Sequence, residues 1–301
     1  MRAPVLALAM AMGVGPMLHA ATFYLTVAGL GGTAEYEKDF TGWAQDIEKG
    51  LRKADPSAHI ATLYGPAANR AHVELTLNQI AREAKPDDRL AVFLIGHGSF
   101  DGEQYNMNVP GPDISAADLA QWLNRMPPRK QLVVVMTSAS GAAAPALERA
   151  DRVVMTATKS GNEKNLTVFA RYWVDALRDE SADTDKNQAI SALEAFRYAE
   201  RKTAAFYEAG KRLATEHPQV AGAEQGALLA SQFPLVNLST EGEKARLADP
   251  AKAKLLAHKQ ATEAKIDELK LKKASMAEDD YRKQLADLLL DLAQTQAELD
   301  R

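Results

Sequence analysis

Two stretches of the sequence decide the fold. Leu90–Ile95 (LAVFLI) is followed by the turn Gly96–Ser99 (GHGS), and Leu132–Met136 (LVVVM) is followed by the turn Thr137–Gly141 (TSASG). Neither apolar run alternates with polar residues, which is typical of strands that are buried on both faces of a sheet. Each stretch therefore predicts a central strand of a parallel sheet that ends in a small, polar turn.

Strand-like and helix-like segments alternate on both sides of these two stretches. Short apolar runs predict further strands at Phe23–Ala28, His59–Leu63 and Val153–Thr156, and helical patterns lie near residues 39–53, 70–84, 115–125 and 142–149. This alternation is typical of a mostly parallel sheet with helices on both faces. The sequence therefore predicts a three-layer αβα domain.

The pattern changes after Gly161. Residues 164–178 and 191–213 are predicted to be helical, and residues 214–240 to be irregular. Residues 241–301 are rich in charge and carry two apolar seams at helical spacing, which predicts a C-terminal helical hairpin. The seams either pack on each other or on the main domain, or they form a dimerisation surface; the sequence leaves both alternatives open.

Composition bounds the class of protein. The chain has 301 residues, a formal net charge of −4 and no cysteine. The negative net charge does not favour binding to nucleic-acid phosphates. The absence of cysteine excludes disulfides, thiolate metal sites and cysteine nucleophiles. After Arg2, the apolar stretch Val5–Gly15 and the small residues up to Ala20 predict a signal peptide over residues 1–20. No later apolar run is long enough to span a bilayer, so we expect a secreted or periplasmic protein.

The two polar turns are the best candidates for chemistry. In a parallel sheet, ligands bind beyond the carboxyl ends of the strands. His97 and Ser138 follow two strands that we expect to be neighbours, and such a pair places a base beside a nucleophile. The glycines allow backbone N–H groups to approach an oxyanion.

These turns resemble those of the legumain-like and caspase-like (caspase–haemoglobinase fold) cysteine peptidases. In that family one strand ends in His-Gly, as at His97-Gly98, and the next ends in a turn such as Ala-Cys-x-Ser-Gly, which Thr137–Gly141 resembles. Ser138 stands where the family has its catalytic cysteine. The segment Val153–Thr158 resembles the next strand of the fold, and the likeness covers roughly residues 22–235. The chain also resembles a bacterial subgroup of exported proteins with a Ser-Ala-Ser-Gly turn.

The resemblance implies a peptide hydrolase with an altered nucleophile. Ser138 would attack the peptide carbonyl, His97 would accept its proton, and the N–H groups of Gly98 and Ser138 would hold the oxyanion. A serine usually needs a base that a third group holds in place, and no spacing singles out Asp101, Glu103 or Asp113 for that role.

Three interpretations of Ser138 therefore stay open. It is a working nucleophile, a relic in a site that only binds peptide, or a small residue that the turn requires. His97 has an alternative role as a strand-end histidine that bonds to the backbone.

Other residues are weaker candidates for the same cleft. Thr158 and Ser160 follow the next predicted strand and are expected to line the cleft, and Arg70 at a helix start is expected to meet a carboxylate from a substrate or from a neighbouring residue. The alternative for Arg70 is a solvated surface position.

An acidic loop between two predicted helices fits the calcium-loop template. Asp183, Asp185, Asn187 and Glu194 occupy positions 1, 3, 5 and 12, which supply oxygen ligands in that template. Gln188 stands where the template has glycine. The alternative is an acidic loop that caps the following helix.

The sequence thus predicts a signal peptide (1–20), a caspase/legumain-like α/β domain (21–240) and a charged helical hairpin (241–301). The predicted function is an exported peptidase-like protein with a Ser138–His97 pair and weak or absent hydrolysis. The alternative is a pseudopeptidase that binds peptide or acts as a scaffold through its cleft and hairpin. Neither needs a cofactor, apart from Ca²⁺ at the acidic loop. The expected partners are a peptide or protein and, through the hairpin, a second copy, but no nucleic acid.

Overall fold

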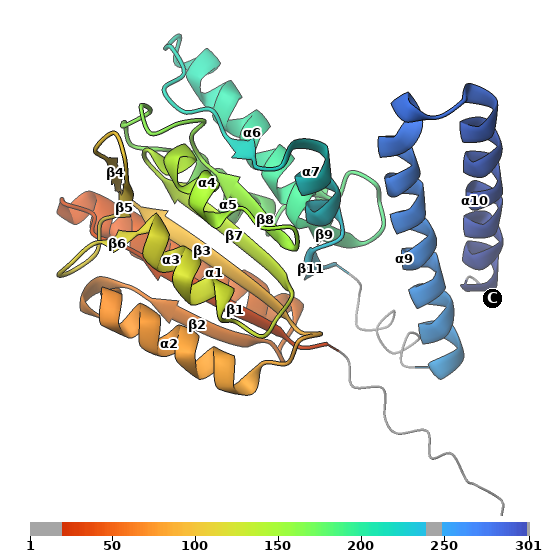
Figure 1. Cartoon of the computed structure of the whole chain (residues 1–301), viewed down its shortest axis with the longest axis horizontal. Helices are drawn as coiled ribbons and strands as arrows, with labels where there is room; N and C mark the ends of the chain where they lie inside the picture. Colours follow the sequence, from red (N-terminus) through yellow and green to blue (C-terminus); the bar gives the residue numbers. More distant parts are fainter. Residues whose placement is uncertain (1–19, 239–248, 300–301) are drawn as a thin grey trace, which may run out of the picture.

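The computed structural model describes residues 20–238 and 249–299, so most of the predicted signal peptide lies outside it. A six-stranded sheet forms the centre of the main domain, in the order β10-β8-β7-β3-β1-β2 (Figure 1). Its parallel strands are β1 (Thr22–Ala28), β2 (His59–Leu63), β3 (Arg89–Gly96), β7 (Lys130–Thr137) and β8 (Arg152–Thr156). Only β10 (Gln219–Val220), at one edge, runs antiparallel to its neighbour.

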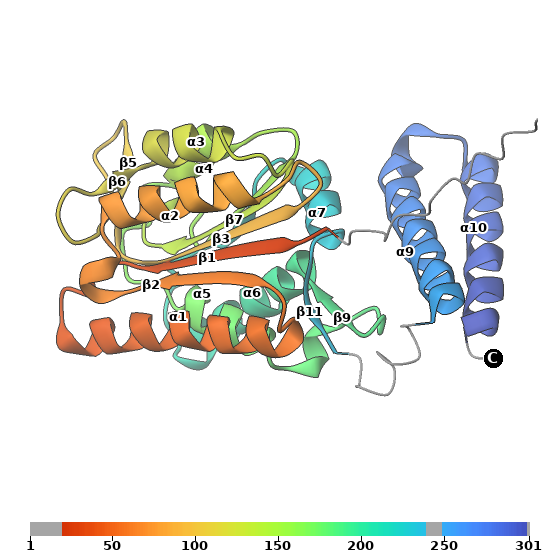
Figure 2. The ribbon, with the colours of Figure 1, turned by 90° about the horizontal axis from the view of Figure 1, so that it is seen from below.

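Helices cover both faces of the sheet (Figure 2). One face carries α1 (Ala34–Ala54), α5 (Phe169–Ala176) and α6 (Ala192–Ala209); the other carries α2 (Arg70–Glu83), α3 (Ala116–Asn124) and α4 (Ala144–Leu147). Each layer has its own apolar core, with Trp173 fully buried in the first and Leu119 in the second. Because both faces are covered, β3 and β7 are apolar throughout their centres, and the predicted three-layer αβα class is confirmed.

Several short elements were not predicted. A three-stranded antiparallel sheet of β4 (Gly98–Phe100), β5 (Tyr105–Met107) and β6 (Ile114–Ser115) follows β3 directly. Residues 214–240 were expected to be irregular, but besides β10 they contain α7 (Ala223–Ser231) and β11 (Pro234–Asn237), which pairs with β9 (Ala189–Ser191). The helix predicted over 164–178 is limited to α5. Strands of two to four residues are too short to show a hydrophobic period, so the pattern could not reveal them. Single turns of 3₁₀ helix lie at Gly65–Ala67, Ser140–Ala143, Glu180–Ala182 and Lys272–Ser275.

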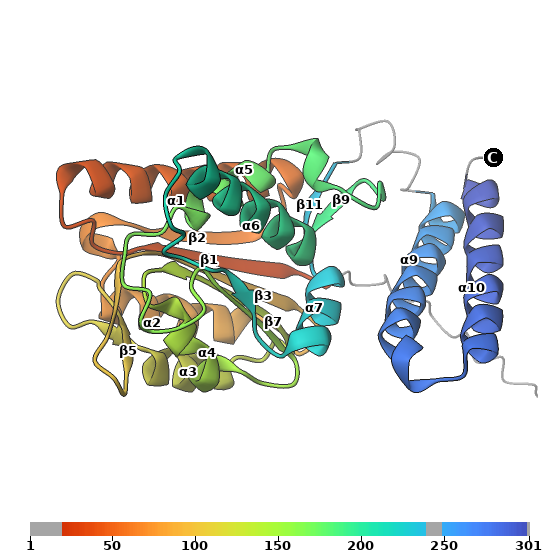
Figure 3. The same ribbon diagram turned by 90° about the horizontal axis from the view of Figure 1, so that it is seen from above.

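The C-terminal helices α9 (Pro250–Leu271) and α10 (Glu278–Leu299) pack against each other as an antiparallel hairpin. Lys252 Nζ donates to the carbonyl of Leu299 at 3.1 Å, and Thr262 Oγ1 donates to Asp291 at 2.8 Å. Figure 3 shows the hairpin beside α7, at the opposite end of the domain from β5. Self-association through this hairpin stays a prediction. In the described ranges, no helix is long and apolar enough to cross a membrane.

Candidate active site

The sheet register brings His97 and Ser138 together. Gly96, the last residue of β3, pairs with Thr137, the last residue of β7. His97 and Ser138 are the next residues of these two neighbouring strands, so both lie at the carboxyl edge of the sheet. The sequence prediction of adjacent strand ends is confirmed at this level.

His97 is held by a backbone carbonyl. Its Nε2 lies 3.1 Å from the carbonyl oxygen of Gly31. A carbonyl only accepts hydrogen bonds, so Nε2 carries the proton, and in the neutral ring Nδ1 is left as the acceptor. The rings of Tyr36 and Phe40 pack edge-to-face on the imidazole, with centroid distances of 5.6 and 5.3 Å. The orientation of the imidazole is therefore fixed by Gly31, Tyr36 and Phe40, and Nδ1 is the nitrogen that can accept a proton.

Ser138 is engaged with the backbone of Gly98 instead of with His97. Its Oγ donates to the Gly98 carbonyl at 2.9 Å and accepts from the Gly98 N–H at 3.1 Å. Ser138 is only 3% exposed. Within residues 20–238 and 249–299, no hydrogen bond joins Ser138 to the imidazole. The N–H of Gly98 was predicted to bind an oxyanion, but it donates its hydrogen bond to the Ser138 hydroxyl.

The turn after Ser138 is strained and firmly held. Ala139 has φ +54°, a left-handed conformation that residues with a side chain rarely adopt. Its N–H donates to the carbonyl of Glu163 at 2.8 Å. Ser140 Oγ accepts from the N–H of Thr158, and the N–H of Gly141 donates to Thr158 Oγ1. Strained backbone of this kind persists where the surrounding structure fixes it, which is common at functional sites.

Two residues predicted to line the cleft form hydrogen bonds within the turns. Thr158 is fully buried, and its Oγ1 donates to the carbonyl of Ser160 besides bonding to the Ser138 turn. Ser160 Oγ accepts from the N–H of Asn162 at 3.3 Å. The structure thus gives Thr158 a positioning role. Contact of either residue with substrate stays a prediction.

Arg70 forms an ion pair within the protein. Both terminal nitrogens of its guanidinium bind the carboxylate of Asp118 on α3, and the guanidinium lies 5.4 Å from the centroid of the Trp122 ring. The hydrogen bonds from Arg70 hold the pKa of Asp118 at about 2, below its ordinary value of 3.8. This pair joins α2 to α3, so the predicted binding of a substrate carboxylate by Arg70 would have to displace Asp118.

We expect Arg70→Gln to lower the free energy of unfolding by about 1 kcal/mol at pH 7, the value for a partly exposed pair. A carboxylate with a depressed folded pKa stabilises the fold above its unfolded pKa and loses this effect as the pH falls. The difference between wild type and variant should therefore shrink between pH 4 and pH 2. Urea unfolding at several pH values measures it. Arg82→Gln, an exposed change on the same helix, is the control, and a pH-independent difference would contradict the prediction.

None of the acidic residues considered as a third group contacts His97. Asp101 accepts from the N–H groups of Glu103 and Gln104, and Asp113 accepts from Asn108 and Val109. The group that orients the His97 ring is the carbonyl of Gly31. The signal that sequence analysis missed is the glycine-rich segment after β1, because β1 lies directly beside β3.

The acidic loop brings three of its four predicted ligands together. Oxygen atoms of Asp183, Asp185 and Glu194 lie within 4.8 Å of one another. Asn187 bonds within the loop: its Oδ1 accepts from the N–H of Ala189. Gln188 has φ +65°, the left-handed backbone that the template's glycine adopts. Burial, and then the nearby Glu194, raise the pKa of Asp185 to about 6. The alternative role is also present, since Glu194 and Ser191 form a capping box for α6.

We predict that 10 mM Ca²⁺ stabilises the protein by about 1–3 kcal/mol, as expected for a site of 10⁻⁴–10⁻³ M affinity. Asp185→Asn should remove most of the rise in melting temperature, because it removes one of the three clustered carboxylates and lies on the exposed side of the loop. Calorimetry with Ca²⁺ and with a chelator measures the effect. Asp87→Asn is a control at an exposed position outside the loop, and an unchanged wild-type melting temperature in Ca²⁺ would contradict the prediction.

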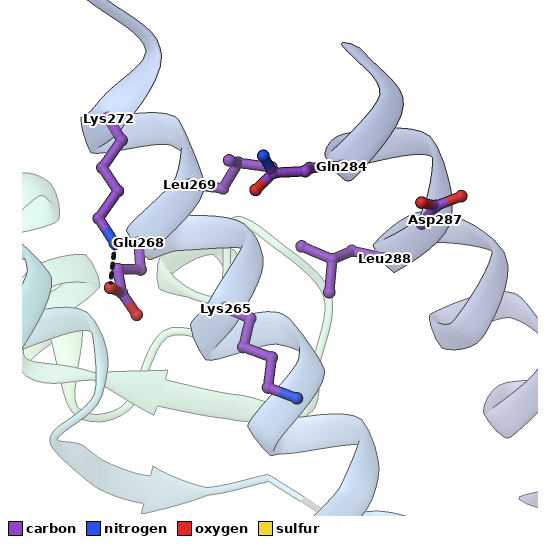
Figure 4. Close-up of a pocket in the computed structure, with 7 residues that line it drawn as sticks. All are labelled: Lys265, Glu268, Leu269, Lys272, Gln284, Asp287 and Leu288. Carbon is purple, nitrogen blue, oxygen red and sulfur yellow. Dashed lines mark hydrogen bonds and ion pairs between the residues drawn. The ribbon is translucent and has the colours of Figure 1, made fainter. Parts of the chain in front are cut away.

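A groove of about 360 Å³ lies between α9 and α10, away from the sheet edge (Figure 4). Leu269 and Leu288 face each other across it, and Glu268 and Lys272 on its rim form an ion pair of 2.6 Å. No lining residue comes from the main domain. The groove is therefore separate from His97 and Ser138.

The chain is an α/β protein whose parallel sheet carries a histidine and a small hydroxyl residue at adjacent strand ends. The family model of the peptidase C13 family matches residues 51–219, more than half of the chain. The chain belongs to the peptidase C13 family.

Two solved structures are similar to this chain. Caspase-1 from Spodoptera frugiperda is similar with a TM-score of 0.46 and 14% identity, over 67% of this chain and 85% of that one. Protein GSU0716 from Geobacter sulfurreducens is similar with a TM-score of 0.46 and 12% identity, over 73% and 99%. Among curated proteins, no sequence match was found.

Proposed function

We propose that this chain is an exported member of the peptidase C13 family that binds peptide segments at the carboxyl edge of its sheet, and that Ser138 does not act as a nucleophile. One observation carries the proposal. The buried Ser138 hydroxyl already uses its donor and one acceptor position on the carbonyl and N–H of Gly98. A serine hydroxyl attacks a peptide bond only when a base takes its proton, and here the proton points to a carbonyl.

Apolar side chains at the same edge support peptide binding. Leu30 and Tyr64 follow β1 and β2, and each is 41% exposed. Leu30 precedes Gly31, whose carbonyl holds His97. Exposed apolar residues mark a binding surface where they form a contiguous patch, so the proposal requires a peptide that contacts both Leu30 and Tyr64. The surface is suited to an extended peptide with apolar side chains.

A second candidate function is slow serine hydrolysis. The orientation of His97 by Gly31 and the strained Ala139 favour it, since both are features of a site prepared for a nucleophile. Hydrolysis would need the Ser138 hydroxyl to rotate away from Gly98, which would also free the N–H of Gly98 for the oxyanion.

A serine-reactive fluorophosphonate probe separates the two functions. Under the proposal, the wild type is labelled no more than Ser138→Ala; labelling that depends on both Ser138 and His97 would establish the hydrolase instead. Selection from a phage-displayed peptide library tests binding. We expect Leu30→Asp to abolish the enrichment, whereas Leu75→Asp, at an exposed leucine on α2, should retain it. No enrichment on the wild type would contradict the binding function.

Export is part of the proposal and rests on the N-terminal sequence. Cleavage after Ala20 would leave Ala21 as the first residue, directly before β1. We expect mass spectrometry of the protein from its native host to show a mature chain that begins at or next to Ala21. An intact Met1 in the cytosolic fraction would contradict export.

A further inference from the structure

We propose that Glu37 is the positioning residue of His97 and acts through Gly31. The inference deepens the proposed function, since it concerns the same site. Glu37 is an acidic group that is linked to His97 through Gly31, whereas Asp101 and Asp113 bond elsewhere.

The contacts form a chain of two hydrogen bonds. Glu37 Oε2 accepts from the N–H of Gly31 at 2.8 Å, and the carbonyl of Gly31 accepts from His97 Nε2 at 3.1 Å. The two groups of Gly31 belong to successive peptide units, so the coupling is mechanical: the carboxylate fixes the place of Gly31, and Gly31 fixes the ring. A hydrogen bond to a carboxylate is stronger than one between neutral groups.

Close packing around Gly31 allows the hydrogen bond between its N–H and Glu37 to form. A Cβ built on Gly31 would lie 2.2 Å from the backbone nitrogen of Glu37 and 2.6 Å from its Cα. Only glycine therefore lets the loop approach α1 closely enough for the bond. The N–H of Leu30 donates to the carbonyl of Asn108 at 3.0 Å, so the two successive N–H groups that precede the Gly31 carbonyl are both fixed by hydrogen bonds.

The first two turns of α1 present three groups to the site. Thr33 caps the helix, and Tyr36, Glu37 and Phe40 follow within its first two turns. Tyr36 and Phe40 contact the imidazole directly, and Glu37 reaches it through Gly31. The start of this one helix thus sets the orientation of the base, while β3 sets its position.

Exchange of the His97 Nε2 proton with water tests the proposal in the native protein. In ¹⁵N-labelled protein at a pH where the ring is neutral, we expect this proton to give an observable resonance because it is hydrogen-bonded. Glu37→Met keeps the side-chain length but has no acceptor, and it should speed exchange about tenfold, the factor that loss of one ordinary hydrogen bond produces. Glu37→Gln keeps an oxygen acceptor and should restore slow exchange.

Glu35→Met is the matched control. Glu35 is an exposed acidic residue of the same first turn, so its loss changes the helix charge equally without touching Gly31. A purely structural role of Glu37 would lower the melting temperature but leave the Nε2 exchange rate unchanged.

The second measurement is alkylation of the variant Ser138→Cys, which should slow about tenfold when Glu37→Met is added and not when Glu35→Met is added. Equal exchange and alkylation rates in Glu37→Met and Glu35→Met would overturn the proposal. Failure of the peptide-binding function would leave these rates unaffected, so the two failures are distinguishable.

Discussion

Ser138→Cys is expected to gain a thiol that iodoacetamide alkylates about tenfold faster at neutral pH than a surface cysteine, because an imidazole at hand lowers a thiol's pKa. The chain has no other cysteine, so the signal reports this position alone. The sulfur is larger than the hydroxyl oxygen and a poorer partner for the backbone of Gly98, which favours its rotation toward Nδ1 of His97. The variant tests whether the remaining residues of the site can still activate a nucleophile at position 138.

Two further variants complete this experiment. Gln121→Cys places a thiol on the exposed side of α3 and gives the reference rate. Adding His97→Ala to Ser138→Cys should return the rate to that reference. A rate for Ser138→Cys that equals the reference, or one that does not depend on His97, would show that the two side chains do not meet.

Gly98→Ala is expected to cost about 3 kcal/mol of unfolding free energy, the upper end of the range for overpacking. A Cβ there would lie 2.6 Å from the carbonyl oxygen of Ser138 and 2.7 Å from both Thr137 Oγ1 and Tyr105 Cε2. Thr137 and Tyr105 bond to each other at 2.7 Å and are buried, so neither has room to move. For a domain of this size the melting temperature should fall by roughly 6–12 °C.

Gly42→Ala is the control for this variant. Gly42 lies in the interior of α1, and a Cβ built there has nothing within 4 Å. Alanine has the higher helix propensity, so this change should stabilise the protein by roughly 0.5–1 kcal/mol. Similar melting temperatures for the two variants would contradict the steric argument at Gly98.

The parts of the fold that sequence patterns predicted are those with long apolar runs. The strand predicted at His59–Leu63 has the bounds of β2, and the runs at residues 90–95 and 132–136 lie inside β3 and β7. The strands β3 and β7 are buried on both faces, so every residue of their apolar runs contributes to the signal, whereas the edge strand β2 is only partly buried. The sheet of β4, β5 and β6 escaped prediction because pairing between distant residues, and not local pattern, creates its strands.

The site was predictable as a location but not as a set of contacts. The order of the strands places His97 beside Ser138, as predicted for two neighbouring strands that end in small, polar turns. The partner of Ser138 did not follow, because Gly98 competes with His97 for the same hydroxyl. The partner of His97 could not be predicted either, because every residue has a backbone carbonyl and the sequence does not show which one binds the ring.

The strand order also has a consequence for how the chain acquires its structure. Residues 22–96 supply three adjacent strands, β2, β1 and β3, in the order in which they lie in the sheet. Until residues 130–137 arrive as β7, the eight residues of β3 form an open and almost wholly apolar edge. Such edges pair with other chains, which is how incomplete parallel sheets aggregate. A chain cut anywhere between β3 and β7 is therefore a fragment prone to self-association, because its first three strands need β7 to cover their apolar edge.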